Sequence, residues 1–533
     1  MLMASLILIP VIFGIILYIL PLKLGKLILL GVQGYLLALA VFLFLQTDHN
    51  PELYVILGGD NPILNIVLLG NRVSLLLVIV TTFLFGMGFI YKITDTFFNN
   101  KLMLLYLILQ GLTIGIFLTD DLFNLFIFFE VSTVITTLLL MFKQEGRVVY
   151  DALYYLITQM VSMLFFLFGI GFLYRMFGML SISGIASLIA YAPVSELVLP
   201  FSFMMAGLCF KLGIFPMYGW ISRAYGLNSA PITQIAVMSS IMMKAALYWV
   251  FRFHYMFLPA FNYSRIFIVF AVATQIFGII KAISQKDIRL MLSFSTVSQI
   301  GLMMAARFLG DEVSFAGSLY HIVNHAIFKM ILFLSAGLII RQYKTANIYE
   351  IRGVMNQIPF AGSVSIIGMF AITGFPFTSG SVSKYLMSAG LGSVALEVLF
   401  WIMNFGTILV FVKYARMLLP VAKSPLKIKR VKQIALDLLV LVSLTTGFSL
   451  NQGANTLLQV DLPLNMKAYV QKGITYLVLV IIAMLLYKWV LPKKKILYDN
   501  IEHSLSFSKI ILVLVAFFTV FVTYGMLLYY QAP

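Results

Sequence analysis

Apolar stretches of about twenty residues recur along the chain, and short polar segments with most of the charges separate them. A membrane-spanning α-helix needs about twenty apolar residues, whereas a membrane β-strand needs about ten residues of alternating polarity. The pattern therefore predicts an all-α polytopic membrane protein with about 14–16 transmembrane helices. We place candidate spans at residues 4–20, 26–46, 72–92, 101–119, 121–142, 152–174, 199–221, 231–251, 264–283, 290–308, 315–340, 362–387, 396–416, 434–450, 473–491 and 508–529.

The distribution of basic residues predicts the topology. If the N-terminus lies outside, 25 of the 36 Lys and Arg residues fall in inner loops, as the positive-inside rule requires. This accounts for the net charge of +17 without a nucleic-acid partner. The first span reads as a retained helix, because no basic segment precedes it. We therefore predict a multi-pass protein of the cell (inner) membrane with its N-terminus outside. Anionic lipid or a soluble partner at the clusters 423–432 and 493–495 is the alternative to topology alone.

Composition narrows the choice of function. The sequence is 62% hydrophobic and 10% charged, which excludes a soluble protein of this size. Its single cysteine, Cys209, lies inside an apolar stretch and provides no Fe–S or cysteine zinc site. We expect no cofactor, no metal and no catalytic centre within the chain.

Ionisable residues interrupt several apolar stretches. An ionisable group inside a spanning helix costs roughly 2.5–3.5 kcal/mol on insertion scales, so it usually faces a polar interior and marks an ion or proton path. The candidate path residues are Glu130, Lys211, Lys244, His321, His325, Lys329 and Lys384.

Each of these groups also has a simpler interpretation. Glu130 and Lys211 predict a coupled acid–lysine pair, but a static buried ion pair would give the same sequence. Lys244 and Lys384 could instead extend toward the headgroups. Asp120 and Asp121 are expected at the outer surface, where they begin a helix and complement its dipole.

His321, His325 and Lys329 are spaced by four residues, so they share one helix face. Histidine both donates and accepts near neutral pH, which suits proton transfer. A metal site is the weaker alternative, because no carboxylate or cysteine is spaced to complete it. Hydrogen bonds that only pack helices are a third possibility, and Asn324 or Gln299 could take part in either role.

Two segments resemble each other. Residues 153–159 (LYYLITQ) align with 319–325 (LYHIVNH). Pro216 and Pro376 both lie in mid-span, three and two residues after a glycine. A repeated unit with broken helices is typical of transporters. We predict N-terminal helices at 1–100, five-helix repeats at 101–252 and 253–416, and C-terminal helices at 417–533, with breaks at Pro216 and Pro376.

Four longer motifs carry a family resemblance. They are DLFNLFIFFE at 121–130, KLGIFPMYGW at 211–220, KDIRLMLSFSTVSQIG at 286–301 and HIVNHAIFKMILFL at 321–334. Over about residues 70–420 the chain resembles the antiporter-like membrane subunits of Mrp-type Na+/H+ antiporters, membrane-bound hydrogenases and respiratory complex I. The phenylalanine-rich stretch before Glu130 is most similar to the D-type subunits of Mrp antiporters and their hydrogenase-type relatives.

The resemblance implies a fold and a function. It implies two inverted five-helix repeats with broken helices 7 and 12, and a proton path that matches the residues named above. It also implies membrane partner subunits. Arg223 departs from the family, since an acid is usual near that position, and Ser379-Gly-Ser381 replaces the usual Gly-Phe. The last two spans exceed the fourteen-helix core, and we expect them to contact a neighbouring subunit.

Three functions follow. The first is a proton-translocating subunit of a multi-subunit cation/proton antiporter that exchanges Na+. The second is a proton-pumping subunit of a redox enzyme of the hydrogenase or complex I type, driven by peripheral Fe–S subunits. The third is a structural subunit that conducts no ions, although unused buried charges would then cost stability.

Overall fold

The structure is a computed structural model that describes residues 1–58, 66–95, 97–142, 146–226, 230–419, 429–462, 464–489 and 505–531. Within this part, fifteen helices are long and apolar enough to cross a membrane, which confirms the predicted all-α membrane fold. The predicted span 362–387 is broken near Pro376, as predicted, and consists of two shorter helices, α16 (Pro359–Thr373) and α17 (Ser379–Ala389). Most of the two predicted basic clusters, at 423–428 and 493–495, lies outside the described residues.

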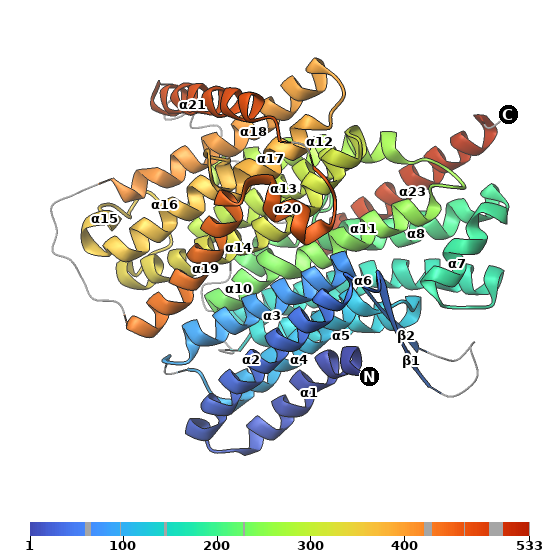
Figure 1. Cartoon of the computed structure of the whole chain (residues 1–533), viewed down its shortest axis with the longest axis horizontal. Coiled ribbons are helices and arrows are strands. Elements are labelled where there is room, and N and C mark those ends of the chain that lie inside the picture. The colour runs from blue at the N-terminus through green and yellow to red at the C-terminus, as the bar shows by residue number, and fades with distance from the viewer. Residues whose placement is uncertain are drawn as a thin grey trace. The chain divides into compact units, whose positions relative to one another are not determined.

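The chain forms two compact units, and the first takes in the described parts of residues 1–234, 241–266 and 505–533. In this unit α6 packs against α5 and α8, and α23 packs along α8 (Figure 1). Its helices are α1 (Leu2–Ile19), α2 (Leu22–Gln46), α3 (Arg72–Lys92), α4 (Asn100–Leu118), α5 (Leu122–Leu140), α6 (Gly146–Phe177), α7 (Ile182–Leu188), α8 (Val194–Leu212), α9 (Ile221–Tyr225), α11 (Met243–Phe257) and α23 (Phe507–Gln531).

The second unit takes in the described parts of residues 235–240 and 267–504. Its central helix is α14, which contacts α13, α16, α17 and α19. The remaining helices are α13 (Ile288–Leu309), α14 (Glu312–Tyr343), α15 (Val354–Gln357), α18 (Val394–Ala415), α19 (Arg430–Phe448), α20 (Leu450–Leu458) and α21 (Met466–Trp489). α10 (Ile232–Val237), the π-helix Met238–Met242 and α12 (Ser264–Ser284) each have residues in both units.

Burial differs strongly between the helices. The apolar windows of α13 and α14 are 94% buried, whereas that of α21 is 17% buried. Polar side chains inside a membrane protein are stable only where other protein groups surround them. The inner helices can therefore carry lysine and histidine, while the peripheral ones present apolar side chains outward.

Polar caps fix where several helices begin. The Asp121 carboxylate accepts the Asn124 backbone N–H at 2.6 Å, and so caps α5 as predicted. Asp311 caps α14 in the same way, through the N–H groups of Val313 and Ser314. Such caps satisfy backbone donors that the first helical turn leaves unpaired. The first residues of α5 and α14 are thereby held in place.

Asp120 differs from its prediction as an outer-surface residue. Its side chain is fully buried. The carboxylate accepts the backbone N–H of Ser183 at 3.2 Å, and Arg252 approaches it at 4.0 Å. Asp120 therefore holds the start of α7 against the body of the first unit. Sequence reasoning missed α7, because its seven residues are too short to give a span-like signal.

An antiparallel hairpin was also missing from the predictions. β1 (Glu52–Leu57) pairs with β2 (Ile66–Asn71), with Glu52 opposite Asn71 and Leu57 opposite Ile66. The Asn71 side chain and Ser74 then form a capping box that begins α3. The hairpin thus leads directly into a transmembrane helix.

Candidate functional site

A break after α8 positions Lys211. Lys211 lies in the last turn of this helix, and Gly213 ends it in a left-handed conformation with φ of +66°. This positive φ is a conformation that glycine adopts at no steric cost. The non-helical segment 213–220 contains Pro216, where the sequence predicted a break.

Neutral oxygens from two neighbouring helices surround the Lys211 ammonium group. Its Nζ donates to Thr133 Oγ1 on α5 at 2.8 Å, and lies 3.5 Å from Gln159 Oε1 on α6. It also lies 5.4 Å from the ring centroid of Phe129. Hydroxyl, amide and aromatic groups can stabilise a buried ammonium without neutralising it. These groups can therefore hold the Lys211 ammonium group without a carboxylate in direct contact.

Glu130 lies on α5 beside this lysine. The two side chains are close enough for their opposite charges to interact. Among the residues that the structure describes, however, no direct ion pair joins them, so the static salt bridge is not the geometry found. Glu130 is partly exposed, at the edge of an apolar face with Ile127 and Val131. A change in the charge of Glu130 would thus act on Lys211 through the electrostatic interaction between the two side chains.

Lys244 lies in the first turn of α11, directly after the π-helix. Its side chain is fully buried. π-helical turns occur frequently at functional sites, because they re-aim side chains within a helix. Full burial argues against the alternative in which Lys244 extends to the headgroups.

His321 on α14 is part of a hydrogen-bonded chain across the second unit. Gln299 Nε2 donates to Thr407 at 2.9 Å, so its Oε1 faces His321 Nε2 at 3.1 Å. On the other side of the ring, His321 Nδ1 lies 2.7 Å from Ser383 Oγ. This network assigns the Nε2–H tautomer to neutral His321. Nδ1 then accepts the Ser383 hydroxyl, and donates to it when the ring is charged.

Ser383 can respond to such a change. Its hydroxyl lies 3.2 Å from the carbonyl oxygens of Ser379 and Gly380, so it has alternative acceptors when His321 Nδ1 carries a proton. A hydroxyl that can reverse its direction is what stepwise proton transfer requires. The ring of His325 follows at a centroid distance of 5.9 Å from that of His321.

Two more predicted lysines bind backbone carbonyls. Lys329 Nζ donates to Leu292 O at 2.7 Å and to Ser295 Oγ on α13. Lys384 Nζ donates to Ile372 O and to Asn404 Oδ1, each at 2.6 Å. Ile372 lies in the last turn of α16, whose final carbonyls lack intrahelical donors. Lys384 is 3% exposed and binds a carbonyl next to the helix break that contains Pro376, which argues against the alternative in which it extends to the headgroups.

The structure thus groups the predicted residues in two sets. Glu130, Lys211 and Lys244 belong to the first unit, and His321, His325, Lys329 and Lys384 to the second. It also adds polar partners that no sequence motif indicated, namely Thr133, Gln159, Ser383, Asn404 and Thr407. Within the described residues, no cluster of three His, Cys, Asp or Glu side chains is arranged to hold a metal ion.

Arg223 has a partner that explains its unusual charge. Its Nη1 donates to Asp151 Oδ1 on α6 at 2.7 Å, and its guanidinium lies 4.2 Å from the ring of Tyr154. The acid opposite this arginine therefore stands on another helix. Sequence reasoning missed the pair because 72 positions separate the two residues.

We expect Arg223→Ala to destabilise the protein more than the exchange Arg223→Asp/Asp151→Arg, because the single change leaves a partly buried carboxylate without its partner. The loss should be roughly 1–3 kcal/mol. Thermal unfolding of the purified protein would measure it, with Asp151→Ala as the second single variant. Equal unfolding temperatures for all four proteins would show that the ion pair contributes no stability.

The chain is similar to known proteins over more than half of its length. The profile of the family described as "NADH:quinone oxidoreductase/Mrp antiporter, TM" matches residues 119–412, which is more than half of the chain. The chain belongs to this family. The match covers all seven predicted path residues.

Relatives come from two kinds of complex. The N-type subunit of the NADH-quinone oxidoreductase of Desulforudis audaxviator is 31% identical over 291 residues, or 54% of this chain and 58% of that protein. The D-type subunit of the Na(+)/H(+) antiporter of Alkalihalophilus pseudofirmus is 28% identical over 287 residues, or 53% and 57%. The chain thus spans somewhat more than half the length of these relatives.

A solved structure shares the fold. A chain of the archaeal membrane-bound sulfane sulfur reductase superposes with a TM-score of 0.79, covering 90% of this chain and 99% of that chain at 22% identity. The NADH:quinone oxidoreductase/Mrp antiporter fold thus extends over most of the chain. The solved structure is of an archaeal respiratory membrane complex, and the Alkalihalophilus pseudofirmus relative is named as a subunit of an antiporter.

Proposed function

We propose that this chain is a proton-translocating subunit of a multi-subunit cation/proton antiporter that exchanges Na+. A change of charge at Glu130 shifts the proton affinity of Lys211. The proton passes Lys244, continues along the α14 face of His321, His325 and Lys329, and leaves near Lys384. The chain contributes the proton path, and other membrane subunits contribute cation movement.

The arrangement of Glu130 and Lys211 is the observation that carries this proposal. A purely structural pair would be expected to form a direct salt bridge, because buried charges are stable when closely paired. Here Lys211 instead binds the neutral oxygens of Thr133 and Gln159. Glu130 is near enough to influence it, yet each group can change charge without breaking an ion pair. Such a pair suits a site that changes its protonation state during transport.

The second unit supplies an analogous arrangement around its own helix break. Lys384 binds a carbonyl at the end of α16 and the amide of Asn404, again with neutral oxygens only among the described partners. His321 contacts Ser383 on α17, the helix that also carries Lys384. Alternating lysine, histidine and hydroxyl groups provide sites between which a proton can move.

The face around Glu130 supports a membrane partner. Ile127, Val131 and Val134 of α5 are each between 38% and 39% exposed beside the partly exposed carboxylate. A carboxylate directed at lipid would be costly, whereas one at an interface between subunits can be solvated by protein groups. We propose that a neighbouring membrane subunit covers this face and changes the charge of Glu130.

The alternative is a proton-pumping subunit of a redox complex of the hydrogenase or complex I type. The relative from Desulforudis audaxviator is named as part of a quinone oxidoreductase, and the solved homologue belongs to a sulfur reductase complex. In that case peripheral Fe–S subunits would drive proton movement along the same lysines. Gentle solubilisation from the native membrane, with mass spectrometry of the co-purifying proteins, separates the two. Membrane subunits alone support the antiporter, and Fe–S subunits support the redox pump.

Replacing Glu130 with glutamine should lower Na+-driven proton movement several-fold, because the amide keeps the shape and removes the charge that acts on Lys211. Membrane vesicles carrying the whole complex, with a pH-sensitive dye, would measure this. Glu196→Gln is the control, since Glu196 is an exposed acid in the first turn of α8. Full activity in the Glu130 variant would contradict both transport proposals.

A further inference from the structure

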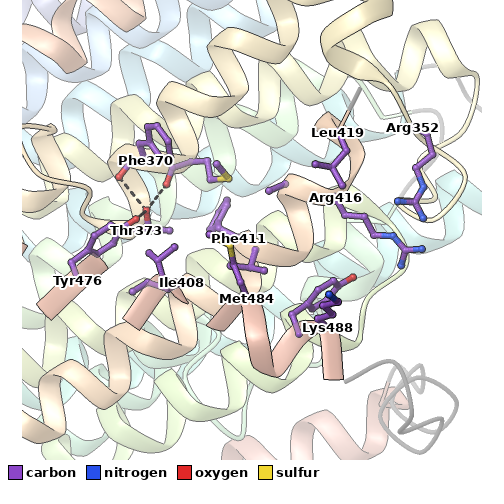
Figure 2. Close-up of a pocket in the computed structure, with 15 residues that line it drawn as sticks. Arg352, Phe370, Thr373, Ile408, Phe411, Arg416, Leu419, Tyr476, Met484 and Lys488 are labelled. Carbon is purple, nitrogen blue, oxygen red and sulfur yellow. Dashed lines mark hydrogen bonds between the residues drawn. The ribbon is translucent and has the colours of Figure 1, made fainter. Parts of the chain in front are cut away.

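A groove in the second unit lies outside the predicted path. It has a volume of about 580 Å³ and is lined by side chains of α16, α18 and α21 and of the segments next to them. Figure 2 shows basic side chains at one end of the groove, and Thr373 and Tyr476 at the other. The volume is within the range of small-molecule binding sites, about 300–1,000 Å³.

Three cations form the basic end. Arg352 precedes α15, Arg416 follows α18, and Lys488 lies in the last turn of α21. In the described part of the chain, none of the three forms an ion pair with an acid. Partial burial lowers the pKa of the Arg352 guanidinium, and the neighbouring charge of Arg416 lowers it further. Like charges held together without an acid favour an anionic ligand.

The remainder of the groove is apolar. Phe370 and Met369 of α16, Ile408 and Phe411 of α18, and Met484 of α21 line its length. At the far end, the hydroxyls of Thr373 and Tyr476 lie 2.8 Å apart and bind each other, so they offer little to a polar ligand. A ligand that fits must therefore carry its charge at one end and a hydrocarbon body beyond it.

We propose that this groove binds an anionic phospholipid, with the phosphate between Arg352, Arg416 and Lys488 and an acyl chain along Phe370, Ile408 and Phe411. Free phosphate would use only the basic end and leave the apolar wall exposed. A protein segment is less suitable, since its backbone would need hydrogen-bond partners that the apolar wall does not offer and the paired Thr373 and Tyr476 hydroxyls offer little. α21 is mostly exposed, so lipid has access to this side.

Because of the position of the groove, a bound lipid would affect the stability of nearby helices. Thr373 is the last residue of α16, and the preceding residue, Ile372, accepts the Lys384 ammonium. α21 packs along α18. A bound acyl chain would fill the space that α21, α18 and the end of α16 enclose. Lipid binding should therefore stabilise the helix break where Lys384 lies.

The test is native mass spectrometry of the purified chain, titrated with dioleoyl phosphatidylglycerol and separately with dioleoyl phosphatidylcholine. We expect preference for the anionic lipid. Binding should be roughly thirty-fold weaker in Arg352→Gln/Arg416→Gln, because this variant loses the attraction of two arginines for the lipid phosphate. Val412→Trp, which places a large ring in the groove and keeps the cations, should weaken binding as well. Lys23→Gln/Lys101→Gln, at exposed lysines, is the control for charge loss.

Each alternative has its own signature. Unchanged binding in both groove variants would overturn the proposal. Loss in the arginine variant alone, with inorganic phosphate competing fully against phosphatidylglycerol, would indicate an anion site without an acyl-chain site and also overturn it. Crosslinking of a photoreactive residue at Val412 to another protein in native membranes, rather than to lipid, would assign the groove to a protein partner instead. Crosslinking to lipid would support the proposal.

Discussion

Lys211→Met should reduce proton movement roughly ten- to a hundredfold, the change expected when a hydrogen-bonded charge worth about 1.5–3 kcal/mol is lost. Methionine has a similar length and volume, so the space between α5, α6 and α8 stays filled. It cannot carry a proton, and it cannot use the Thr133 and Gln159 oxygens that now stabilise the ammonium. The measurement is Na+-driven proton flux in vesicles that contain the whole complex.

A measurement of stability separates this effect from misfolding. Lys211→Met removes the cost of burying an ammonium group, and this offsets the loss of its hydrogen bonds to Thr133 and Gln159. No direct ion pair with Glu130 is broken, so Lys211→Met should melt close to the wild-type temperature while transport falls. Lys467→Met is the matched control, because Lys467 is exposed at the start of α21. Wild-type flux in the Lys211 variant would remove this lysine from the path, and equal losses in both variants would point to a nonspecific effect.

Thr133 and Gln159 show which part of the site sequence could not supply. The lysine itself is visible, because one cation in an apolar run departs from the pattern. Its partners are a threonine and a glutamine on two other helices, and residues of these types occur throughout the chain. Only packing shows which of them face Lys211. The same holds for Asn404 beside Lys384.

The transmembrane helices were predictable for a simple physical reason. A membrane span must be apolar over its whole length and satisfy its own backbone, so each leaves a long signal. The hairpin β1–β2 and the short helix α7 lack that signal and were missed. The single predicted span at 362–387 contains a real interruption, which the Gly-Phe-Pro motif at 374–376 indicated but whose extent only the structure gives.

The interruption between α16 and α17 depends on a very close backbone contact. A Cβ built on Gly380, in the first turn of α17, would lie 1.7 Å from Ala371 O. Gly447 of α19 closes the same region, because a Cβ there would lie 2.6 Å from Phe377 O. Backbone atoms cannot move aside as a flexible side chain can. These two glycines allow α16, α17 and α19 to meet at the break that places Lys384.

Gly380→Ala should therefore destabilise the second unit by roughly 3 kcal/mol, at the upper end of the usual cost of overpacking. Elsewhere the same change has the opposite sign, since alanine in a helix is favoured over glycine by about 1 kcal/mol. Gly171→Ala in α6 is the control, because no atom lies within 4 Å of its added Cβ. Thermal unfolding in one detergent would compare the two variants with wild type.

The two outcomes have different meanings for the site. A lower unfolding temperature for Gly380→Ala, with Gly171→Ala unchanged or higher, would show that the tight α16–α17 contact exists. Since Lys384 reaches Ile372 O at 2.6 Å across this contact, transport should fall together with stability. If Gly380→Ala instead melts like wild type, α17 lies farther from α16 than the structure places it. Lys384 would then have another partner than Ile372 O, and the second half of the proposed path would not be supported.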